Sequence, residues 1–320
     1  MPRPDPRRAA DVTVKVGQGV LISPDNNRAI HHRHAVSLQN QFNKGDSPML
    51  QQPLFQPILH ARPIRVGLLG YGRAGQAVAT VLMSDPALDL RWVLRRHVAA
   101  TTTLPGSDIP VCACPPEAFE AWLVAHPVDV LIDFSDAAAL PLYADAVRRV
   151  RVAVVSAVSS YPQETLAQAQ VLGEYVPVMC SPNITLGINF LMLAAKLLRH
   201  IAPQADVEVV EQHFRDKPEV SGTARKLAQA LNVDASHITA LRLGGIVGHH
   251  EVIFGFPHQT VRLVHDSIRR EAFGTGAAFA VKELVRCSPG FYSFESLLLR
   301  QVQACWGELP ASSEAVPLPS

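Results

Sequence analysis

Ile64 to Gly75 read I-R-V-G-L-L-G-Y-G-R-A-G, an apolar run of strand length that leads directly into the pattern G-x-G-x-x-G. Gln76 to Met83 follow with the composition of a helix. In this strand–turn–helix setting Gly70 permits the tight turn, Gly72 lets the backbone approach a pyrophosphate, and Gly75 lets the helix pack on the strand. The stretch therefore predicts the dinucleotide-binding turn of a Rossmann-type sheet.

The second expected strand, Leu90 to Leu94, should end beside the adenosine ribose, where an NAD-specific protein usually has Asp or Glu. This chain has Arg95, Arg96 and His97 instead. Two guanidinium groups can pair with a 2′-phosphate and stack on adenine. The sequence therefore favours NADPH over NADH, and the alternative is that the arginines belong to a basic surface turn.

A second informative segment runs from Glu211 to Thr223 and reads E-Q-H-F-R-D-K-P-E-V-S-G-T. It follows an apparent strand, so His213 and Lys217 should leave the strand end together, while Ser221-Gly222-Thr223 should open the next helix. Free backbone N–H groups and the positive end of the helix dipole favour a bound carboxylate there. A desolvated Lys and a His can exchange protons near neutral pH. The segment predicts a site for an anionic substrate that must be protonated.

Each of these residues also has an ordinary structural explanation. His213 can cap the strand, Lys217 can be a solvated loop residue, and Ser221 or Thr223 can be an ordinary N-cap. Their joint spacing, and not any one residue, favours the chemical interpretation.

Size and composition exclude several classes of protein. The chain has 320 residues, which suits two domains with separate cores. The 29 basic and 28 acidic residues nearly balance, which argues against nucleic acid as a partner. The five cysteines lack C-x-x-C spacing, which argues against a disulfide framework or a structural zinc site and favours the cytoplasm. The apolar stretch Ile188 to Leu198 is short and contains Lys196, so we expect a buried helix and not a membrane span.

The two ends of the chain differ from the middle. Residues 1–60 are dominated by Pro, Arg, Asn, Gln and His without a sustained helical or strand period, so we expect a disordered extension, and residues 306–320 should form a disordered tail. The extension lacks the apolar core of a secretory signal. Its His31, His32 and His34 have no neighbouring cysteines or carboxylates, so no metal site is predicted.

Strand-like and helix-like segments alternate up to residue 185, which is typical of a doubly wound parallel sheet. We therefore expect an α/β, dinucleotide-binding Rossmann domain over residues 61–185. Besides the segments above, its expected strands are Val128–Asp133, Ala153–Ser156 and Val176–Met179, and its expected helices are Glu117–Ala125, Ala137–Arg148 and Gln163–Leu172.

After Leu186 the pattern changes. A long helix, Leu186 to His200, precedes strands that follow one another with few helices between them, which indicates an open mixed or antiparallel sheet and hence a second, α+β domain over residues 186–288. Its expected strands are Asp206–Gln212, Ile238–Leu243, Glu251–Phe256 and Thr260–Asp266, with helices at Ala224–Leu231 and Phe273–Val285.

From about Ile64 to Leu299 the chain resembles the 4-hydroxy-tetrahydrodipicolinate reductase family, also called dihydrodipicolinate reductase. Several motifs in the right order make the resemblance specific. Residues 289–305 look like the family's closing segment, which returns to the nucleotide domain. Besides the two segments quoted above, the motifs are Asp133-Phe134-Ser135, Ser181-Pro182-Asn183-Ile184-Thr185-Leu186-Gly187-Ile188-Asn189, Arg242-x-Gly244-x-Ile246-x-Gly248-x-His250, Pro289-Gly290-Phe291-Tyr292 and Leu297-Leu298-Leu299.

The resemblance implies an NAD(P)H-dependent oxidoreductase of lysine and diaminopimelate biosynthesis, which reduces an unsaturated cyclic dicarboxylate and assembles as a homotetramer through the sheet of its second domain. It places Lys217 and His213 at the catalytic positions, with Lys217 as proton donor and His213 stabilising developing charge. The substrate carboxylate would contact Ser221, Gly222 and Thr223. The implied cofactor contacts, together with those of the glycine turn, are Gly70, Tyr71, Gly72, Arg73, Ala74, Gly75, Arg95, Arg96, Ser156, Ala157, Val158, Ser181, Pro182, Asn183 and Ile184.

Four departures from the family pattern lie around the expected substrate. Ser156-Ala157-Val158-Ser159 replaces the usual Gly-Thr-Thr-Gly beside the nicotinamide, and Phe214 replaces the second His of a His-His pair. Only three residues separate Lys217 from Ser221, one fewer than usual, and the segment from Leu231 to Arg242 lacks most of a long loop. The cofactor is therefore better supported than the substrate.

Two other functions stay open at this point. One keeps the fold and changes the substrate, as in a related amino-acid dehydrogenase or imine reductase, and Phe214 with the altered nicotinamide loop would be its features. The other is a non-catalytic NADP(H)-binding sensor. His213, Lys217 and the Ser-Gly-Thr turn speak against a sensor, because a protein that only binds needs no proton donor.

Overall fold

The computed structural model describes residues 62–97 and 100–308, and the expectations for residues 1–60 and for the C-terminal tail lie largely outside this range. A mainly parallel sheet of eight strands has the order β12-β7-β6-β5-β1-β2-β4-β3, and only the β3–β4 pair is antiparallel. Its strands are β1 (Ile64–Leu69), β2 (Leu88–Leu94), β3 (Thr102–Thr103), β4 (Pro110–Cys112), β5 (Val130–Asp133), β6 (Ala153–Ser156), β7 (Pro177–Cys180) and β12 (Gly290–Tyr292).

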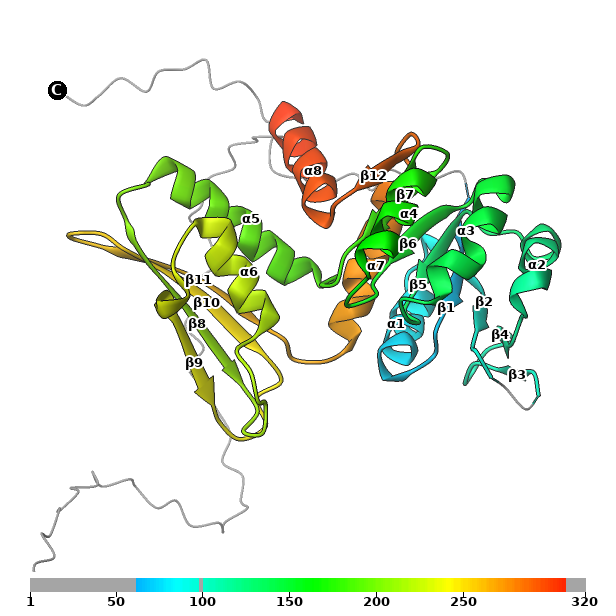
Figure 1. Cartoon of the computed structure of the whole chain (residues 1–320), viewed down its shortest axis with the longest axis horizontal. Helices are drawn as coiled ribbons and strands as arrows, with labels where there is room; N and C mark the ends of the chain where they lie inside the picture. The colour runs from blue at the N-terminus through cyan, green and yellow to red at the C-terminus, as the bar shows by residue number, and fades with distance from the viewer. Residues whose placement is uncertain (1–61, 98–99, 309–320) are drawn as a thin grey trace, which may run out of the picture. The chain divides into compact units, whose positions relative to one another are not determined.

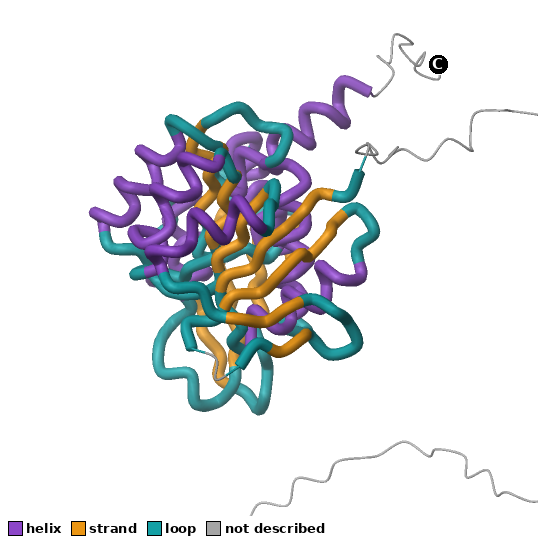
Figure 2. Tube along the Cα trace, turned by 90° about the vertical axis from the view of Figure 1, so that its right-hand side faces the viewer, coloured by secondary structure: helices purple, strands orange, loops and turns teal. Residues whose placement is uncertain are grey.

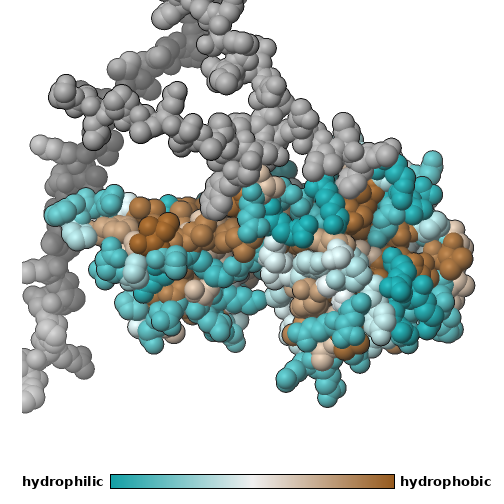
Figure 3. Space-filling model, turned by 90° about the horizontal axis from the view of Figure 1, so that it is seen from above, coloured by the Kyte–Doolittle hydropathy of each residue, from teal (hydrophilic) through white to brown (hydrophobic). Residues whose placement is uncertain are grey.

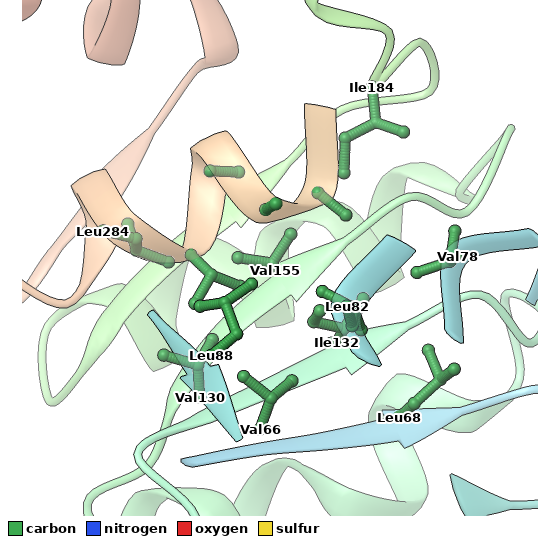
Figure 4. Packing of buried hydrophobic residues seen from close by; sticks show 14 of the residues in the cluster. Val66, Leu68, Val78, Leu82, Leu88, Val130, Ile132, Val155, Ile184 and Leu284 are labelled. Carbon is green, nitrogen blue, oxygen red and sulfur yellow. The ribbon is translucent and has the colours of Figure 1, made fainter. Parts of the chain in front are cut away.

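Helices cover both faces of this sheet because its strands are apolar on both sides. In β5, Ile132 lies in one hydrophobic cluster and Leu131 in the other, and each side chain is fully buried. Figure 4 shows the first cluster, where Ile132 lies with Leu82 and Leu284. The covering helices are α1 (Arg73–Ser84), α7 (Glu271–Leu284) and α8 (Phe294–Glu308) on the first cluster, and α2 (Phe119–Ala125), α3 (Ala139–Val150) and α4 (Gln163–Gly173) on the second.

A smaller mixed sheet follows in the chain, with the order β11-β10-β8-β9. The β8–β9 pair is parallel and the other two pairs are antiparallel. Figure 1 shows α5 and α6 together against this sheet. The elements are α5 (Leu186–Ile201), β8 (Asp206–His213), α6 (Gly222–Leu231), β9 (Ile238–Arg242), β10 (His249–Gly255) and β11 (Thr260–Asp266).

The second sheet is buried on one face only. Along β8 and β10, buried side chains alternate with partly exposed ones, and the buried set packs against α5 and α6. The opposite face carries Val264 and Leu241, which are exposed. The expected fold class, a doubly wound parallel sheet with a second α+β part, is therefore confirmed (Figure 2).

The helix α7 differs from its expected place in the second domain, because it packs in the core of the first sheet against α1. Small residues allow the close approach. A Cβ added at Gly276 would lie 1.6 Å from the carbonyl oxygen of Ile184, and one added at Gly274 would meet Val81 at 2.5 Å. The helix α7 is therefore part of the core of the first sheet.

The short strands β3, β4 and β12 lack a recognisable pattern in the sequence, and the ends of the other elements differ from expectation by a few residues. The face of the molecule in Figure 3 mixes hydrophilic and hydrophobic residues. None of the helices in the described part of the chain has the length and apolarity to cross a bilayer.

Candidate active site

The glycine turn after β1 has the backbone geometry that its motif predicts. Gly70 has φ +90°, a left-handed conformation, and an added Cβ would lie 2.5 Å from the carbonyl oxygen of Phe134. A Cβ at Gly75 would lie 2.1 Å from the carbonyl oxygen of Gly70, so helix and turn approach closely. A Cβ at Gly72 would meet nothing within 4 Å. The first and third glycines are therefore required by packing, while the second faces open space where a ligand can approach.

The turn lines a cavity of about 1080 Å³ together with the end of β2. Gly70, Tyr71 and Gly72 line one part of the cavity, and Arg95 and Arg96 line another. The volume lies just above the usual range for small-molecule sites, and the cavity lies at the carboxyl ends of parallel strands, where such ligands bind in open α/β sheets. The residues present thus fit a dinucleotide.

Asp136, which sequence reasoning did not identify, also lines this cavity and forms an ion pair with Arg96. Its Oδ1 accepts a hydrogen bond from the backbone N–H of Ala138 at 2.9 Å, just before α3 begins. One of the two expected phosphate ligands is therefore already paired with a carboxylate.

The expected nicotinamide loops meet each other but do not line this cavity. Ser156 is fully buried, and its Oγ lies 2.6 Å from the hydroxyl of Tyr161. The backbone N–H of Ser181 donates to the carbonyl of Ser156 at 2.9 Å, and the Ser181 Oγ donates to the carbonyl of Asn183 at 2.7 Å. The two loops form one hydrogen-bonded unit at the ends of β6 and β7.

The second loop also contacts the segment with the expected catalytic residues. The Nδ2 of Asn183 donates to the Oγ1 of Thr223 at 3.2 Å, at the start of α6. Ile184, in contrast, is 2 % exposed and belongs to the core of the first sheet. Its side chain serves packing, so only its backbone remains for the expected cofactor contact.

Glu211 is the centre of the second part of the site and is fully buried. Its Oε2 accepts from the Nδ1 of His213 at 2.6 Å and from Nη1 of Arg242 at 2.9 Å. Its Oε1 accepts from Nη2 of Arg242 at 2.8 Å and from the backbone N–H of Ser221 at 3.0 Å. Burial acts to raise the pKa of Glu211, but the hydrogen bonds from Arg242, Ser221 and His213 outweigh it and lower the pKa to about 2.

Sheet register explains why these groups meet. His213 lies opposite Arg242 across the parallel β8–β9 pair, and Glu211 lies opposite His250 across the antiparallel β8–β10 pair. The rings of His213 and His250 are 5.3 Å apart and roughly perpendicular. Burial, followed by the nearby His213 and His265, lowers the pKa of His250 to about 4. His250 is therefore neutral near pH 7.

The start of α6 is arranged as the sequence predicts. The Oγ of Ser221 accepts from the backbone N–H of Thr223 at 3.2 Å, so Ser221 is the N-cap. The same Oγ lies 2.8 Å from Nε2 of His250. Gly222 is exposed, and a Cβ there would meet nothing within 4 Å. The helix therefore presents an open N-terminus with polar groups, which suits an anion.

Lys217 is half-buried in the turn after β8. Its carbonyl oxygen accepts from Nε of Arg242 at 2.9 Å, and its backbone N–H donates to the carbonyl of Phe214 at 3.1 Å. Its Nζ makes no hydrogen bond or ion pair within residues 62–97 and 100–308. The ammonium group is thus free to meet a substrate. Phe214 itself is 44 % exposed and offers no polar atom where the family pattern has a histidine.

The structure brings together His213, the turn of Lys217 and the Ser221–Thr223 turn, and it adds Glu211, Arg242 and His250, to which sequence reasoning gave no role. The sequence analysis named Glu211 and Arg242 only as members of longer motifs. The usable signal was the alternation of side chains between the two faces of β8, which places the charged Glu211 on the same face as His213. Within residues 62–97 and 100–308, no group of three or more His, Cys, Asp or Glu side chains is arranged to hold a metal ion.

Comparison with known proteins identifies the family of the chain. The family model "Dihydrodipicolinate reductase, N-terminus" matches residues 64–184, and "Dihydrodipicolinate reductase, C-terminus" matches residues 184–298. A 4-hydroxy-tetrahydrodipicolinate reductase of Caldanaerobacter subterraneus is 31 % identical over 250 residues, which cover 71 % of this chain and 94 % of that protein. The corresponding protein of Methanoregula boonei is 27 % identical over 247 residues, with the same coverage.

Among solved structures, the dipicolinate-bound dihydrodipicolinate reductase of Paenisporosarcina sp. TG-14 shares the fold, with a TM-score of 0.63 and 24 % identity over 72 % of this chain and 97 % of that one. The two family models together span both sheets of the structure. The chain therefore belongs to the dihydrodipicolinate reductase family.

Proposed function

We propose that this protein is a 4-hydroxy-tetrahydrodipicolinate reductase, an enzyme of lysine and diaminopimelate biosynthesis. Membership of its family makes it an NAD(P)H-dependent oxidoreductase. The observation that carries the proposal is the arrangement around Glu211, which brings His213, the turn of Lys217 and the N-cap of α6 to one place. A hydride acceptor that is anionic and needs a proton fits these groups.

The substrate in this proposal is a small cyclic dicarboxylate. The names of the similar proteins specify 4-hydroxy-tetrahydrodipicolinate, and the Paenisporosarcina structure holds dipicolinate. One carboxylate would lie at the open start of α6, against the backbone N–H of Gly222 and the Thr223 hydroxyl, beside the N-cap Ser221. Lys217 would face the same substrate.

The cofactor in this proposal is NADPH, with NADH as a second possible donor. The turn Gly70–Gly75 would hold the pyrophosphate, and Arg95 and Arg96 would hold the 2′-phosphate. When bound, the dinucleotide supplies the hydride, and the protein supplies orientation and charge. The loops at Ser156–Val158 and Ser181–Ile184 would orient the nicotinamide.

Two side chains would complete the reduction. Lys217 donates a proton from Nζ to the reduced substrate, since its ammonium group has no competing partner among the described residues. His213 has Nδ1 turned to Glu211, so its Nε2 is the atom left to stabilise the charge that develops. Neither role requires a metal ligand.

One observation favours a second candidate. Phe214 is exposed in the turn between His213 and Lys217, and the loop from Ser156 carries side chains where the family pattern has glycines. A related cyclic imine with fewer polar groups would suit an apolar wall better. The alternative function is therefore imine reduction or amino-acid dehydrogenation on the same fold.

The deciding experiment follows NADPH absorbance in the presence of freshly generated 4-hydroxy-tetrahydrodipicolinate. We expect rapid oxidation of NADPH that depends on both protein and substrate. Turnover of an unrelated cyclic imine at a higher kcat/KM would favour the alternative function. Tight NADPH binding without turnover of either compound would identify a sensor.

The assembly is also part of the proposal. The uncovered face of the second sheet carries Val264 and Leu241 with partly exposed Val210 and Ile253, and burying such a face usually requires a partner. We propose a cytoplasmic homotetramer built through this sheet. Light scattering after size-exclusion chromatography tests it, and a Val264→Lys variant should lower the measured mass.

A further inference from the structure

The buried carboxylate of Glu211 is connected to every element that carries the proposed catalytic groups. It accepts four hydrogen bonds: one from β8, two from the end of β9 and one from the start of α6. It is fully buried, so no water competes for these bonds. Glu211 therefore has all of its main acceptor positions used by the protein and none left for a substrate.

The first consequence concerns the proton on His213. An ionised carboxylate only accepts hydrogen bonds, so the Nδ1 of His213, which lies 2.6 Å from Oε2, must carry its hydrogen. Neutral His213 then has its lone pair at Nε2, and protonated His213 donates from Nε2. Gly248 lies on that side, and a Cβ there would be 3.4 Å from Nε2. A residue without a side chain therefore stands beside the reactive nitrogen.

The second consequence concerns the turn of Lys217. Arg242 is held by both oxygens of Glu211 in a bidentate pair. Two of its other hydrogen atoms reach the turn, where Nε donates to the carbonyl of Lys217 at 2.9 Å and Nη2 donates to the carbonyl of Glu219 at 2.7 Å. These carbonyls flank Pro218. Glu211 thus fixes the backbone of the proposed proton donor through Arg242.

We propose that Glu211 is the positioning residue of this site: it holds His213 in one tautomer with Nε2 free, and through Arg242 it holds the Lys217 turn against the start of α6. This inference rests on the proposed function for its effect on turnover. Its structural part, the tautomer and the ordered turn, stands independently of the substrate. Glu211 itself does not contact the substrate.

Glu211→Gln is the sharpest test, because it keeps the shape and removes the charge. Both oxygens of Glu211 accept from Arg242, so the amide NH₂ of Gln must face a donor whichever way it points. When the amide NH₂ takes the place of Oε2, it faces the hydrogen on Nδ1 of His213. This conflict can be relieved, because the imidazole can carry its hydrogen on Nε2 instead. We therefore expect the variant to change the tautomer of His213.

Three measurements on the full chain follow. Nitrogen-15 NMR of labelled histidine, with His213 assigned from a His213→Asn variant, should show the Nδ1–H tautomer in the wild type and the Nε2–H tautomer in Glu211→Gln. Hydrogen exchange of residues 214–220 should become faster. Turnover should fall by at least about tenfold while the NADPH dissociation constant stays within about twofold, because His213 loses its carboxylate partner and the Lys217 turn loses its fixed position.

Glu283→Gln is the matched control. Glu283 is also a buried glutamate with side-chain hydrogen bonds, from Gln301 at 2.6 Å and Arg286 at 3.3 Å, but it lies on α7 away from His213. All three measurements should stay as in the wild type. If Glu211→Gln is too unstable to study, Glu211→Asp keeps the charge and should keep the Nδ1–H tautomer with an intermediate turnover.

The outcomes separate this inference from the proposed function. A Glu211→Gln protein with the Nδ1–H tautomer and unchanged exchange in 214–220 would overturn the inference, whatever the substrate. A wild type that does not reduce 4-hydroxy-tetrahydrodipicolinate would overturn the proposed function, while a change of tautomer and faster exchange would still support the role of Glu211.

Discussion

Arg96 is paired with Asp136 inside the cavity that the glycine turn lines. The pair joins the end of β2 to the segment before α3, two places that are 40 positions apart in the sequence. A 2′-phosphate that binds Arg96 must displace this carboxylate or share the guanidinium with it. We therefore expect affinity for NADPH to depend on a competition between Asp136 and the phosphate, and not on the arginines alone.

Replacing Arg95 and Arg96 together with Gln should weaken NADPH binding by about tenfold and leave NADH binding nearly unchanged. Charge-assisted hydrogen bonds contribute about 1.5–3 kcal/mol each at best, and solvent screening reduces this at an exposed site. The Arg96 side chain is 69 % exposed. Fluorescence titration with both nucleotides measures the change. Equal NADPH affinity in the two proteins would mean that the arginines only belong to a surface turn.

Asp136→Asn should have the opposite effect and tighten NADPH binding by about two- to fivefold, since an exposed ion pair contributes up to about 1 kcal/mol. Asn keeps the acceptor that the backbone N–H of Ala138 uses, so α3 should begin as before. The same titration measures the change, with NADH as the control ligand. A loss of NADPH affinity would show that Asp136 helps Arg96 to bind phosphate instead of competing with it.

The contrast between Arg96 and Asp136 shows what the sequence could predict. The glycine turn, the arginines after β2, and the residues from His213 to Thr223 are each local in sequence, so spacing alone predicted that they act together. Asp136, Arg242 and His250 reach their places only through sheet order and register, which no local pattern contains. The position of α7 was also missed, because Gly274 and Gly276 fit against Val81 and Ile184 from another part of the chain.

Stability should fall as the pH is lowered from about 6.5 to about 4, in part because of His250. Burial lowers its pKa to about 4 in the folded protein, so between these values the unfolded chain binds a proton that the folded chain does not. The contribution is present above the unfolded pKa and is lost progressively toward the folded pKa, by at most about 3 kcal/mol.

Urea unfolding at a series of pH values gives the free energy of unfolding as a function of pH. Between pH 6.5 and 4 this free energy should change less steeply with pH in His250→Asn than in the wild type. His258, an exposed histidine in the turn after β10, provides the control His258→Asn, which should keep the wild-type slope. At lower pH the sign is the same for Glu211, whose depressed pKa of about 2 places its contribution to acid unfolding between about pH 4.5 and 2. An unchanged slope in His250→Asn would exclude a buried, neutral His250.

Gly276→Ala should destabilise the fold strongly, by several kcal/mol, because the added Cβ would lie 1.6 Å from the carbonyl oxygen of Ile184 and backbone cannot yield easily. The helix α7 would be pushed from the core of the first sheet. Thermal melting measures the loss. Gly245→Ala is the control, since its Cβ would meet nothing within 4 Å and the melting temperature should change little. Similar melting of the two variants would mean that α7 packs elsewhere.

The proposed proton donor and charge stabiliser should be separable from the substrate-binding turn by kinetics. Lys217→Ala and His213→Ala should each reduce turnover by about 10²- to 10⁴-fold, the range for a positioned acid or base, with NADPH affinity nearly unchanged because the cavity at the glycine turn is distinct from both residues. Thr223→Val removes a contact that exists in the ground state as well as in the transition state, so it should mainly raise KM.

Arg215→Ala is the matched control, because Arg215 is an exposed cation in the same turn as Lys217. If Lys217→Ala loses no more activity than Arg215→Ala, Lys217 contributes no more than its positive charge. A donor other than Lys217 must then supply the proton.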